Sequence, residues 1–310
     1  MNKPFDSAAL GSDIARTRRQ YWARRFGAAV VKLLRLNHPT LLTTEIVQAI
    51  NPVATVETRY GPLFCKAGHG RLLWRAQTFF AEEPETINWL DKLQPSDVLW
   101  DIGANVGMYS IYAAKFRKCM TLSFEPEAQN YALLLENIAL NDLAGRCLPA
   151  NLALTRTSEL GRLHVRYLTK GGAYNTFLGG LADQAGDDLP ESLLAAQKYD
   201  KKAGFDQLML GCSIDDLVFK HGLPAPTHLK IDVDGLEPDI VAGGAETFKA
   251  GRPRSVLIEL NSRSAADRAV PDQLAQFGFK VVSKRSNWDS RDDKTRAADL
   301  PAENVILERS

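Results

Sequence analysis

Two polar clusters in this sequence have residue types and spacings that could perform chemistry, and the first is a glycine-punctuated loop. An apolar run begins at Val98 and leads into Asp101-Ile-Gly-Ala-Asn-Val-Gly107. Apolar residues at helical spacing follow, so the segment predicts a strand, a tight loop and a helix. Backbone N–H groups of such a loop, with the helix N-terminus, can face an anionic or polar ligand. The dinucleotide fingerprint G-x-G-x-x-G is not matched, because three residues separate Gly103 from Gly107.

An acidic residue at the end of the next predicted strand could bind a ribose. The strand ends at Glu125 and Pro126, and an acid at this position of a β-α-β unit can accept hydrogen bonds from both ribose hydroxyls. NAD enzymes use the same device, so Glu125 indicates a ribose, and only the preceding loop distinguishes the cofactors. A helix cap at Asp101 and a surface acid at Glu125 are the structural alternatives, but the spacing of the two motifs favours the functional interpretation.

The second cluster lies in Lys230-Ile-Asp-Val-Asp-Gly-Leu-Glu237, where the fourth predicted core strand ends. Ligands bind at the carboxyl edge of open α/β sheets, and strand alternation places Lys230 and Asp232 on one side. In the interpretation that we favour, one of these two removes a proton from an acceptor hydroxyl, although a lysine base needs a lowered pKa.

Two other interpretations of this cluster stay open. In one, Lys230 is simply paired with a carboxylate and the acids cap the next helix. In the other, oxygen ligands hold a hard divalent ion such as Mg²⁺. The weak candidate ligands for such an ion are Asp232, Asp234, Glu259 and Asn261.

Strand and helix patterns alternate along residues 81–310, which predicts an α/β fold with a mostly parallel sheet covered on both faces. Core strands are expected at 98–102, 122–125, 147–154, 227–232, 255–260, 279–283 and 305–307, and helices at 83–90, 128–141, 236–248 and 271–277. The glycine-rich, polar stretch at 169–212 interrupts the pattern. Its length favours a lid over an acceptor, with a surface insertion as the alternative.

Residues 1–80 are predicted to form an N-terminal extension with a small hairpin around Tyr60-Gly-Pro62. A basic helix at residues 12–36 could lie on an anionic membrane surface. We favour instead a helix docked on its own domain or on a second subunit, because its apolar residues are few. An oligomer is therefore a possible state of the chain.

Composition excludes several classes of protein. The chain has 310 residues, of which 45% are hydrophobic, so it can bury a normal core. A net charge of +1 gives no global field for nucleic acid. The four cysteines form no zinc pattern, which predicts reduced thiols and a cytoplasmic location. No apolar run reaches the length of a membrane span, and the first residues lack the apolar core of a signal peptide.

Taken together, these motifs resemble the FkbM family of S-adenosylmethionine (SAM) dependent methyltransferases. The resemblance covers roughly residues 80–262 and rests on the segments 83–86, 101–107, 124–126, 137–141, 151–153, 213–217, 230–237 and 256–259, together with Trp89. It implies a Rossmann-like class I methyltransferase fold with a seven-stranded, mostly parallel sheet. It also implies O-methylation of a hydroxyl on a sugar, glycan or secondary metabolite, hence a small-molecule or glycan acceptor.

On this resemblance, the glycine loop holds the methionine part of SAM, Glu125 holds the ribose, and the end of the third strand lies beside the adenine. The expected cofactor-binding residues are Asp101, Gly103, Ala104, Asn105, Gly107, Glu125, Pro126, Asn151 and Ala153, and the expected catalytic residues are Lys230, Asp232 and Glu237. Two alternatives stay open. A nucleotide-linked oxidoreductase would bind NAD(H) and needs a loop that this chain lacks, and a non-catalytic SAM-binding module would bind a partner without turnover.

Overall fold

The computed structural model describes residues 25–27, 29–30, 32–33, 44, 49–165, 168–173, 175–179, 204–233, 235–286 and 302–310. The chain divides into two compact units, Met1–Pro52 and Val53–Ser310. The basic helix predicted at residues 12–36 lies largely outside the described residues, and those of its residues that are described are helical. None of the helices in the described ranges has the length and apolar character needed to cross a membrane.

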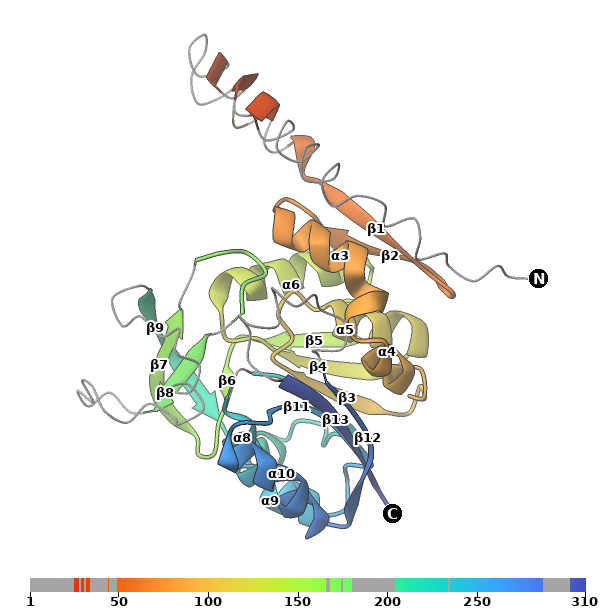
Figure 1. Ribbon diagram of the computed structural model, residues 1–310, viewed down its shortest axis with the longest axis vertical. Coiled ribbons are helices and arrows are strands. Elements are labelled where there is room, and N and C mark those ends of the chain that lie inside the picture. The colour runs from red at the N-terminus through yellow and green to blue at the C-terminus, as the bar shows by residue number, and fades with distance from the viewer. Residues whose placement is uncertain are drawn as a thin grey trace. The chain divides into compact units, whose positions relative to one another are not determined.

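Within the described residues, a seven-stranded sheet forms the centre of the second unit (Figure 1). Its order is β12 (Phe279–Ser286), β13 (Ala302–Arg309), β11 (Ser255–Asn261), β10 (His228–Ile231), β3 (Val98–Ile102), β4 (Met120–Phe124) and β5 (Cys147–Ala150). The pairings from β11 to β5 are all parallel, whereas β13 is antiparallel to both of its neighbours. The mostly parallel α/β sheet expected from the sequence is therefore confirmed.

Strand alternation divides the core into one cluster on each face of the sheet. Leu99 and Leu257 belong to the first cluster, and their neighbours Trp100 and Ile258 belong to the second. Figure 1 shows the covering helices on opposite sides of the sheet. The first group is α3 (Gly70–Glu82), α4 (Pro84–Leu90), α5 (Met108–Tyr112) and α6 (Ala128–Leu140), and the second is α8 (Glu237–Ala242), α9 (Ala245–Lys249) and α10 (Ala265–Ala275). Burial on both faces explains why the strands read as continuous apolar runs.

The single helix predicted at residues 236–248 is two short helices, α8 and α9, with Gly243 and Gly244 between them. A Cβ added to Gly243 would lie 2.4 Å from the carbonyl oxygen of Thr155. The backbone therefore approaches a neighbouring segment too closely for a side chain, and the helix breaks at this contact. Helical periodicity alone does not report such a contact.

A second sheet lies beside the first and corrects two sequence expectations. Its order is β6 (Ala153–Leu154), β9 (Phe205–Cys212), β7 (Glu159–Val165) and β8 (Thr176–Gly179). The strand predicted at 147–154 therefore ends at Ala150, and its last two residues join this second sheet. The stretch at 169–212, expected to lack regular structure, contributes β8 and β9, because Phe177 and Met209 bury their side chains with Leu163. Tyr174, expected in the lid, lies outside the described residues.

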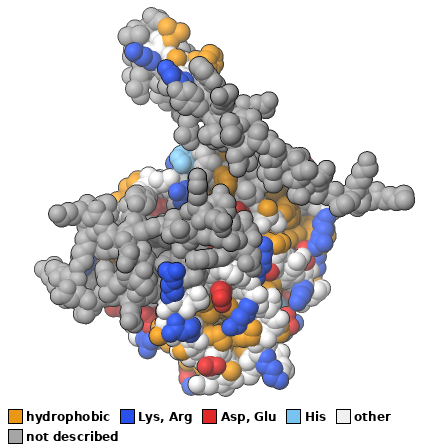
Figure 2. Space-filling model, in the orientation of Figure 1, with side chains coloured by type: hydrophobic (Ala, Val, Ile, Leu, Met, Phe, Trp, Pro, Cys, Tyr) orange, Lys and Arg blue, Asp and Glu red, His pale blue; other side chains and the backbone are white. Residues whose placement is uncertain are grey.

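The predicted hairpin is β1 (Val53–Thr58) paired with β2 (Gly61–Lys66), and it belongs to the second unit. Two buried asparagines, one in α6 and one at its C-cap, bind the backbone of β2. Asn137 Oδ1 accepts from the N–H of Lys66 at 2.8 Å, and Asn141 Oδ1 accepts from the N–H of Phe64 at 3.1 Å. Helix α3, which follows the hairpin, was not predicted. On the face shown in Figure 2, the described basic and acidic side chains are interspersed with apolar ones.

Candidate active site

The glycine-punctuated loop lies where the chain leaves two neighbouring strands in opposite directions. β3 and β10 are adjacent and parallel, but β4 lies beyond β3 on one side and β11 beyond β10 on the other. Such a switch point leaves a crevice at the carboxyl ends of the strands. A Cβ added to Gly103, which has φ of +82°, would lie 1.9 Å from the carbonyl oxygen of Asp232. Only glycine lets the loop pass this close to the end of β10.

Backbone hydrogen bonds hold the loop against β4. The N–H groups of Gly103 and Ala104 both donate to the carbonyl oxygen of Phe124, each at 3.0 Å. At the other end of the loop, a Cβ on Gly107 would lie 2.2 Å from Cδ1 of Leu134. The two glycines therefore permit close backbone approaches at both ends of a loop that crosses the crevice.

Glu125 braces this loop from the end of β4. Its Oε2 accepts from the N–H of Asn105 at 2.8 Å, and its Oε1 accepts from the N–H of Glu127 at 3.0 Å. Burial raises the pKa of Glu125 to about 7, although these two backbone hydrogen bonds oppose the rise. The side chain is only 5% exposed, so Glu125 is more enclosed than a carboxylate pointing into an open cleft. It is positioned both to fix the loop and to present a carboxylate at the β4 end.

Asn105 also connects the loop to the glycine-rich segment at Gly171 and Gly172. Its Nδ2 donates to the carbonyl oxygen of Gly172 at 2.7 Å. The buried Asn130 of α6 accepts from the N–H of Gly171 at 2.8 Å and donates to the same Gly172 oxygen at 3.1 Å. Arg75 of α3 donates to the carbonyl oxygen of Gly171 at 3.2 and 3.3 Å. Hydrogen bonds therefore connect Gly171 and Gly172, at the start of the predicted lid, to the glycine loop, to α3 and to α6.

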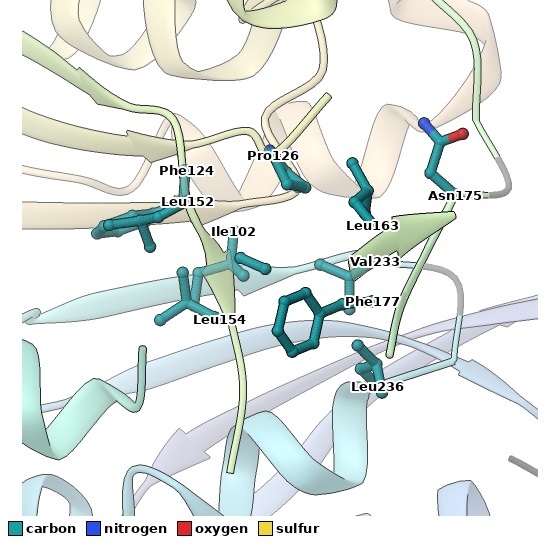
Figure 3. A pocket seen from close by; sticks show the side chains of 12 residues that line it. Ile102, Phe124, Pro126, Leu152, Leu154, Leu163, Asn175, Phe177, Val233 and Leu236 are labelled. Atoms are coloured by element: carbon teal, nitrogen blue, oxygen red, sulfur yellow. The ribbon is translucent and has the colours of Figure 1, made fainter. Parts of the chain in front are cut away.

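An apolar pocket of about 320 Å³, including its part open to solvent, is lined by Phe124 and Pro126, the chain neighbours of Glu125 (Figure 3). Gly103 lines it from the glycine loop, and Ala153, Leu163 and Phe177 line it from the second sheet. An apolar slot next to a carboxylate suits a flat aromatic base joined to a ribose. The residues present therefore fit the adenosine part of SAM.

Pro126 and Asn151, two expected cofactor-binding residues, make different contacts. Pro126 is part of the lining. Asn151 is exposed, and its Nδ2 donates to the carbonyl oxygens of Glu125 and Pro126 at 2.8 and 2.9 Å. Its amide nitrogen therefore stabilises the turn after β4.

The Lys230 and Asp232 side chains, expected on one side of the fourth strand, form an ion pair. Nζ of Lys230 lies 2.8 Å from Oδ2 of Asp232 and 5.2 Å from the centre of the Tyr109 ring. Lys230 is buried, whereas the Asp232 side chain is 30% exposed. Burial alone would lower the pKa of Lys230, but Asp232, Asp101 and Glu83 together raise it above its ordinary value. Lys230 therefore lacks the lowered pKa that a lysine base requires.

Asp101 lies at the centre of the sheet beside Lys230, its register partner across β3 and β10. Its Oδ2 accepts from the Ser110 hydroxyl at 2.5 Å, and its Oδ1 has no hydrogen-bond partner among the described residues. Burial raises the pKa of Asp101, while Lys230 and Ser110 oppose the rise. Asp101 does not line the apolar pocket, and its described contacts are to the loop's helix and to Lys230.

Glu237, the third expected catalytic residue, is buried and bonds to the turn between β10 and α8. Its Oε1 accepts from the N–H of Val233 at 3.1 Å, and its Oε2 accepts from the N–H of Gly235 at 2.9 Å. These bonds fix the backbone that follows Asp232. Glu237 therefore shapes the turn beside the ion pair.

Of the four candidate metal ligands, the structure describes Asp232, Glu259 and Asn261. No group of three or more His, Cys, Asp or Glu side chains in the described ranges could hold a metal ion. Asp234 lies outside the described residues. Asn261 Oδ1 accepts from the N–H of Arg263 at 3.0 Å, which is a local turn contact. Among the described residues, therefore, no metal site is shown.

Two residues join the ion pair that the sequence had not marked as functional. Glu83, the residue before α4, interacts electrostatically with Lys230 and Asp232. Tyr109 of α5 packs its ring near Lys230, and burial together with the Glu83 and Asp232 carboxylates raises the pKa of Tyr109. The available signal for Glu83 was its place in the Glu83-Pro-Glu-Thr86 segment, which belongs to the resemblance. Tyr109 gave none, because an aromatic residue in a core helix is ordinary.

The strand order, the glycine loop at the switch point and the carboxylate at the β4 end define a SAM-dependent methyltransferase. The sequence profile of the methyltransferase FkbM domain matches residues 101–281, and the chain belongs to this family.

The chain is 28% identical to the 31-O-demethyl-FK506 methyltransferase FkbM of Streptomyces tacrolimicus, over 63% of this chain and 76% of that protein. It is 26% identical to the hexuronic acid methyltransferase AglP of Haloferax volcanii, over 61% of this chain and 66% of that protein. Among solved structures, M. jannaschii TYW2 in complex with AdoMet aligns with a TM-score of 0.41 and 13% identity, covering 83% of this chain and 87% of that one.

Proposed function

We propose that this methyltransferase transfers the methyl group of SAM to a hydroxyl oxygen of a sugar, glycan or secondary metabolite. The observation that carries the proposal is the Lys230–Asp232 ion pair at the end of β10, next to the glycine loop. The pair places an exposed carboxylate edge and a fixed ammonium group beside the crevice. The names of two relatives, a demethyl-FK506 methyltransferase and a hexuronic acid methyltransferase, support an acceptor of this class.

We propose that the cofactor is held by the loop, the β4 end and the apolar pocket. The loop from Gly103 to Gly107 faces the methionine part, the Glu125 carboxylate accepts from the ribose hydroxyls, and the pocket beside Ala153 takes the adenine. When bound, SAM supplies a methyl carbon already activated by its sulfonium. The protein then has to align the acceptor oxygen with that carbon and remove a proton.

The acceptor-side residues divide this work. The Asp232 carboxylate, partly exposed, orients the acceptor hydroxyl through a hydrogen bond. Lys230 stays a buried ammonium, because surrounding carboxylates raise its pKa, and it holds Asp232 in one orientation. Glu237 acts indirectly by fixing the turn after Asp232.

A methyl-transfer screen tests the proposed function. The full chain would be incubated with SAM labelled in its methyl group and with a panel of simple glycosides, glycuronides and hydroxylated macrolides. We expect label in an ether-linked methyl group of at least one acceptor class, and transfer only to nitrogen or carbon acceptors would contradict the proposal. Calorimetry with SAM, S-adenosylhomocysteine and NADH is the matched binding test, and binding of NADH alone would contradict it too.

We also propose that the chain works in the cytoplasm, which its four buried free cysteines support. The domain boundary after residue 80, the docking of the basic helix at residues 12–36 on its own domain or on a second subunit, and an oligomeric state remain predictions.

A further inference from the structure

Asn175 is the polar side chain in the lining of the apolar pocket. Among the described residues that line this pocket, every other member is apolar or glycine. Figure 3 shows the Asn175 amide together with the labelled apolar side chains. Asn175 lies in the stretch at 169–212, outside the glycine loop and the β4 end. A segment beside the second sheet therefore adds a polar group to a site that is otherwise apolar.

The amide oxygen of Asn175 is buried without a hydrogen-bond partner among the described residues. Most buried polar atoms in proteins have a partner, and a buried acceptor without one lowers stability. Rotation about the last side-chain bond, which is soft in asparagine, can turn the amide toward the pocket. A donor on a molecule bound there would then give the oxygen its partner. The unpartnered oxygen therefore points to a ligand that carries a hydrogen-bond donor.

Phe177 fixes the strand that follows Asn175. Phe177 lies on β8 and pairs with Leu163 of β7. A Cβ added to Gly161 would lie 2.4 Å from Cζ of Phe177, and one added to Gly211 would lie 2.9 Å from the same atom. The ring therefore fills a space that two glycines leave open. Asn175 directly precedes β8, and both Asn175 and Phe177 line the pocket, as strand alternation requires of residues two positions apart.

The adenine base has a donor that the rest of the proposed site leaves without a partner side chain. The ribose hydroxyls are bound by Glu125 in the proposed function, so the remaining donor of adenosine is the exocyclic amino group of its base. The apolar side chains of the lining can pack on the faces of a purine but cannot bind this group. An asparagine can, because its oxygen accepts from the amino group while its nitrogen donates to a ring nitrogen of the same base.

We propose that Asn175 selects the base of the cofactor, with its Oδ1 accepting a hydrogen bond from the exocyclic amino group of adenine. This inference rests on the proposed binding of SAM in the apolar pocket. The apolar walls hold any purine of the right size, and Asn175 distinguishes adenine from purines that lack the amino group. The stretch at 169–212 thus contributes to cofactor specificity.

Two ligands test this assignment without a known acceptor. One is S-adenosylhomocysteine, and the other is its analogue whose purine carries hydrogen in place of the amino group. Calorimetry on the full chain should show that the wild type binds S-adenosylhomocysteine about tenfold more tightly, because the analogue leaves the Asn175 oxygen unpartnered. Asn175→Leu is similar in size and cannot accept a hydrogen bond. It should bind S-adenosylhomocysteine about tenfold more weakly than the wild type does and should bind both ligands with the same affinity.

The control makes the same chemical change at an exposed position of α4. Asn88→Leu should retain both wild-type affinities. Equal binding of the two ligands by the wild type overturns the proposal, and so does a preference that survives in Asn175→Leu, because another group would then recognise the base. Failure of the wild type to bind S-adenosylhomocysteine contradicts the proposed function instead. Asn175→Ala adds no new atoms, so it should lose the preference in the same way and decides the question if the leucine variant does not fold.

Discussion

Cofactor affinity should follow the ionisation of Glu125. Burial raises the pKa of this carboxyl from 4.5 to about 7, and ribose hydroxyls donate to its ionised form. Binding below this pKa must therefore displace a proton. For a pKa of about 7, the ionised fraction falls from roughly nine tenths at about pH 8 to roughly one tenth at about pH 6. The dissociation constant should rise about tenfold over that interval.

Isothermal titration calorimetry with S-adenosylhomocysteine measures this dependence. Glu125→Gln should bind more weakly at about pH 8 by about 1.5–3 kcal/mol, the value of a hydrogen bond to a charged group, and should lose the pH dependence. Glu136→Gln is the control, because Glu136 is an exposed acid of α6 paired with Lys66, and it should retain the wild-type slope. A wild-type affinity that is the same at both pH values would refute the reasoning.

The same raised pKa predicts how Glu125 affects folding. A folded-state pKa above the unfolded value contributes stability that is complete below the unfolded pKa and is lost as pH rises through the folded pKa. The window therefore extends from 4.5 to about 7, and at about 1.4 kcal/mol per pKa unit the loss is about 3 kcal/mol. The free energy of unfolding of the wild type, measured by urea denaturation, should therefore fall by about 3 kcal/mol across this window. That of Glu125→Gln should not show this fall.

Three further perturbations test other parts of the site. Lys230→Met and Asp232→Asn should each lower the methylation rate about a hundredfold with little change in SAM affinity, and a normal rate in both would show that the pair is purely structural. Gly103→Ala should lower the free energy of unfolding by about 3 kcal/mol through overpacking and positive φ, whereas Gly222→Ala, at φ +67° with open space around it, should cost about 1–2 kcal/mol. Asn130→Ala should lower the free energy of unfolding by about 2 kcal/mol and speed tryptic cleavage at Lys170. Unchanged cleavage would show that Asn130 does not hold the segment at Gly171 and Gly172 in place.

Local pattern was sufficient for the elements with a continuous apolar run or a clear helical period. The strand expected at 98–102 is β3, and the helix expected at 128–141 is α6, which ends at Leu140. Each combines an apolar run or helical period with clear stop signals, so its limits follow from neighbouring residues. The glycine loop that follows β3 was also predictable from local sequence. A close approach of two backbones requires glycine, whichever segment the loop approaches.

The second sheet could not be derived in this way. β6 has two residues and pairs with β9, which lies some fifty positions later in the chain. Along β9, Leu208 and Leu210 are exposed while Met209 between them is buried. Consecutive residues of β9 are therefore apolar in sequence, although their burial alternates along the strand. Only the pairing of β7 with β8 and β9 decides which side faces the pocket.

The chemistry of Lys230 depends on the same non-local information. Its position at a strand end was predictable, and so was its proximity to Asp232. Whether it acts as a base depends on the number of carboxylates around its ammonium group, and Glu83 arrives from a different segment of the chain. With one carboxylate, burial could have lowered the pKa of Lys230 enough for proton removal. With three, the ammonium group is retained, so the number of carboxylates that the fold gathers around Lys230 decides against it as the base.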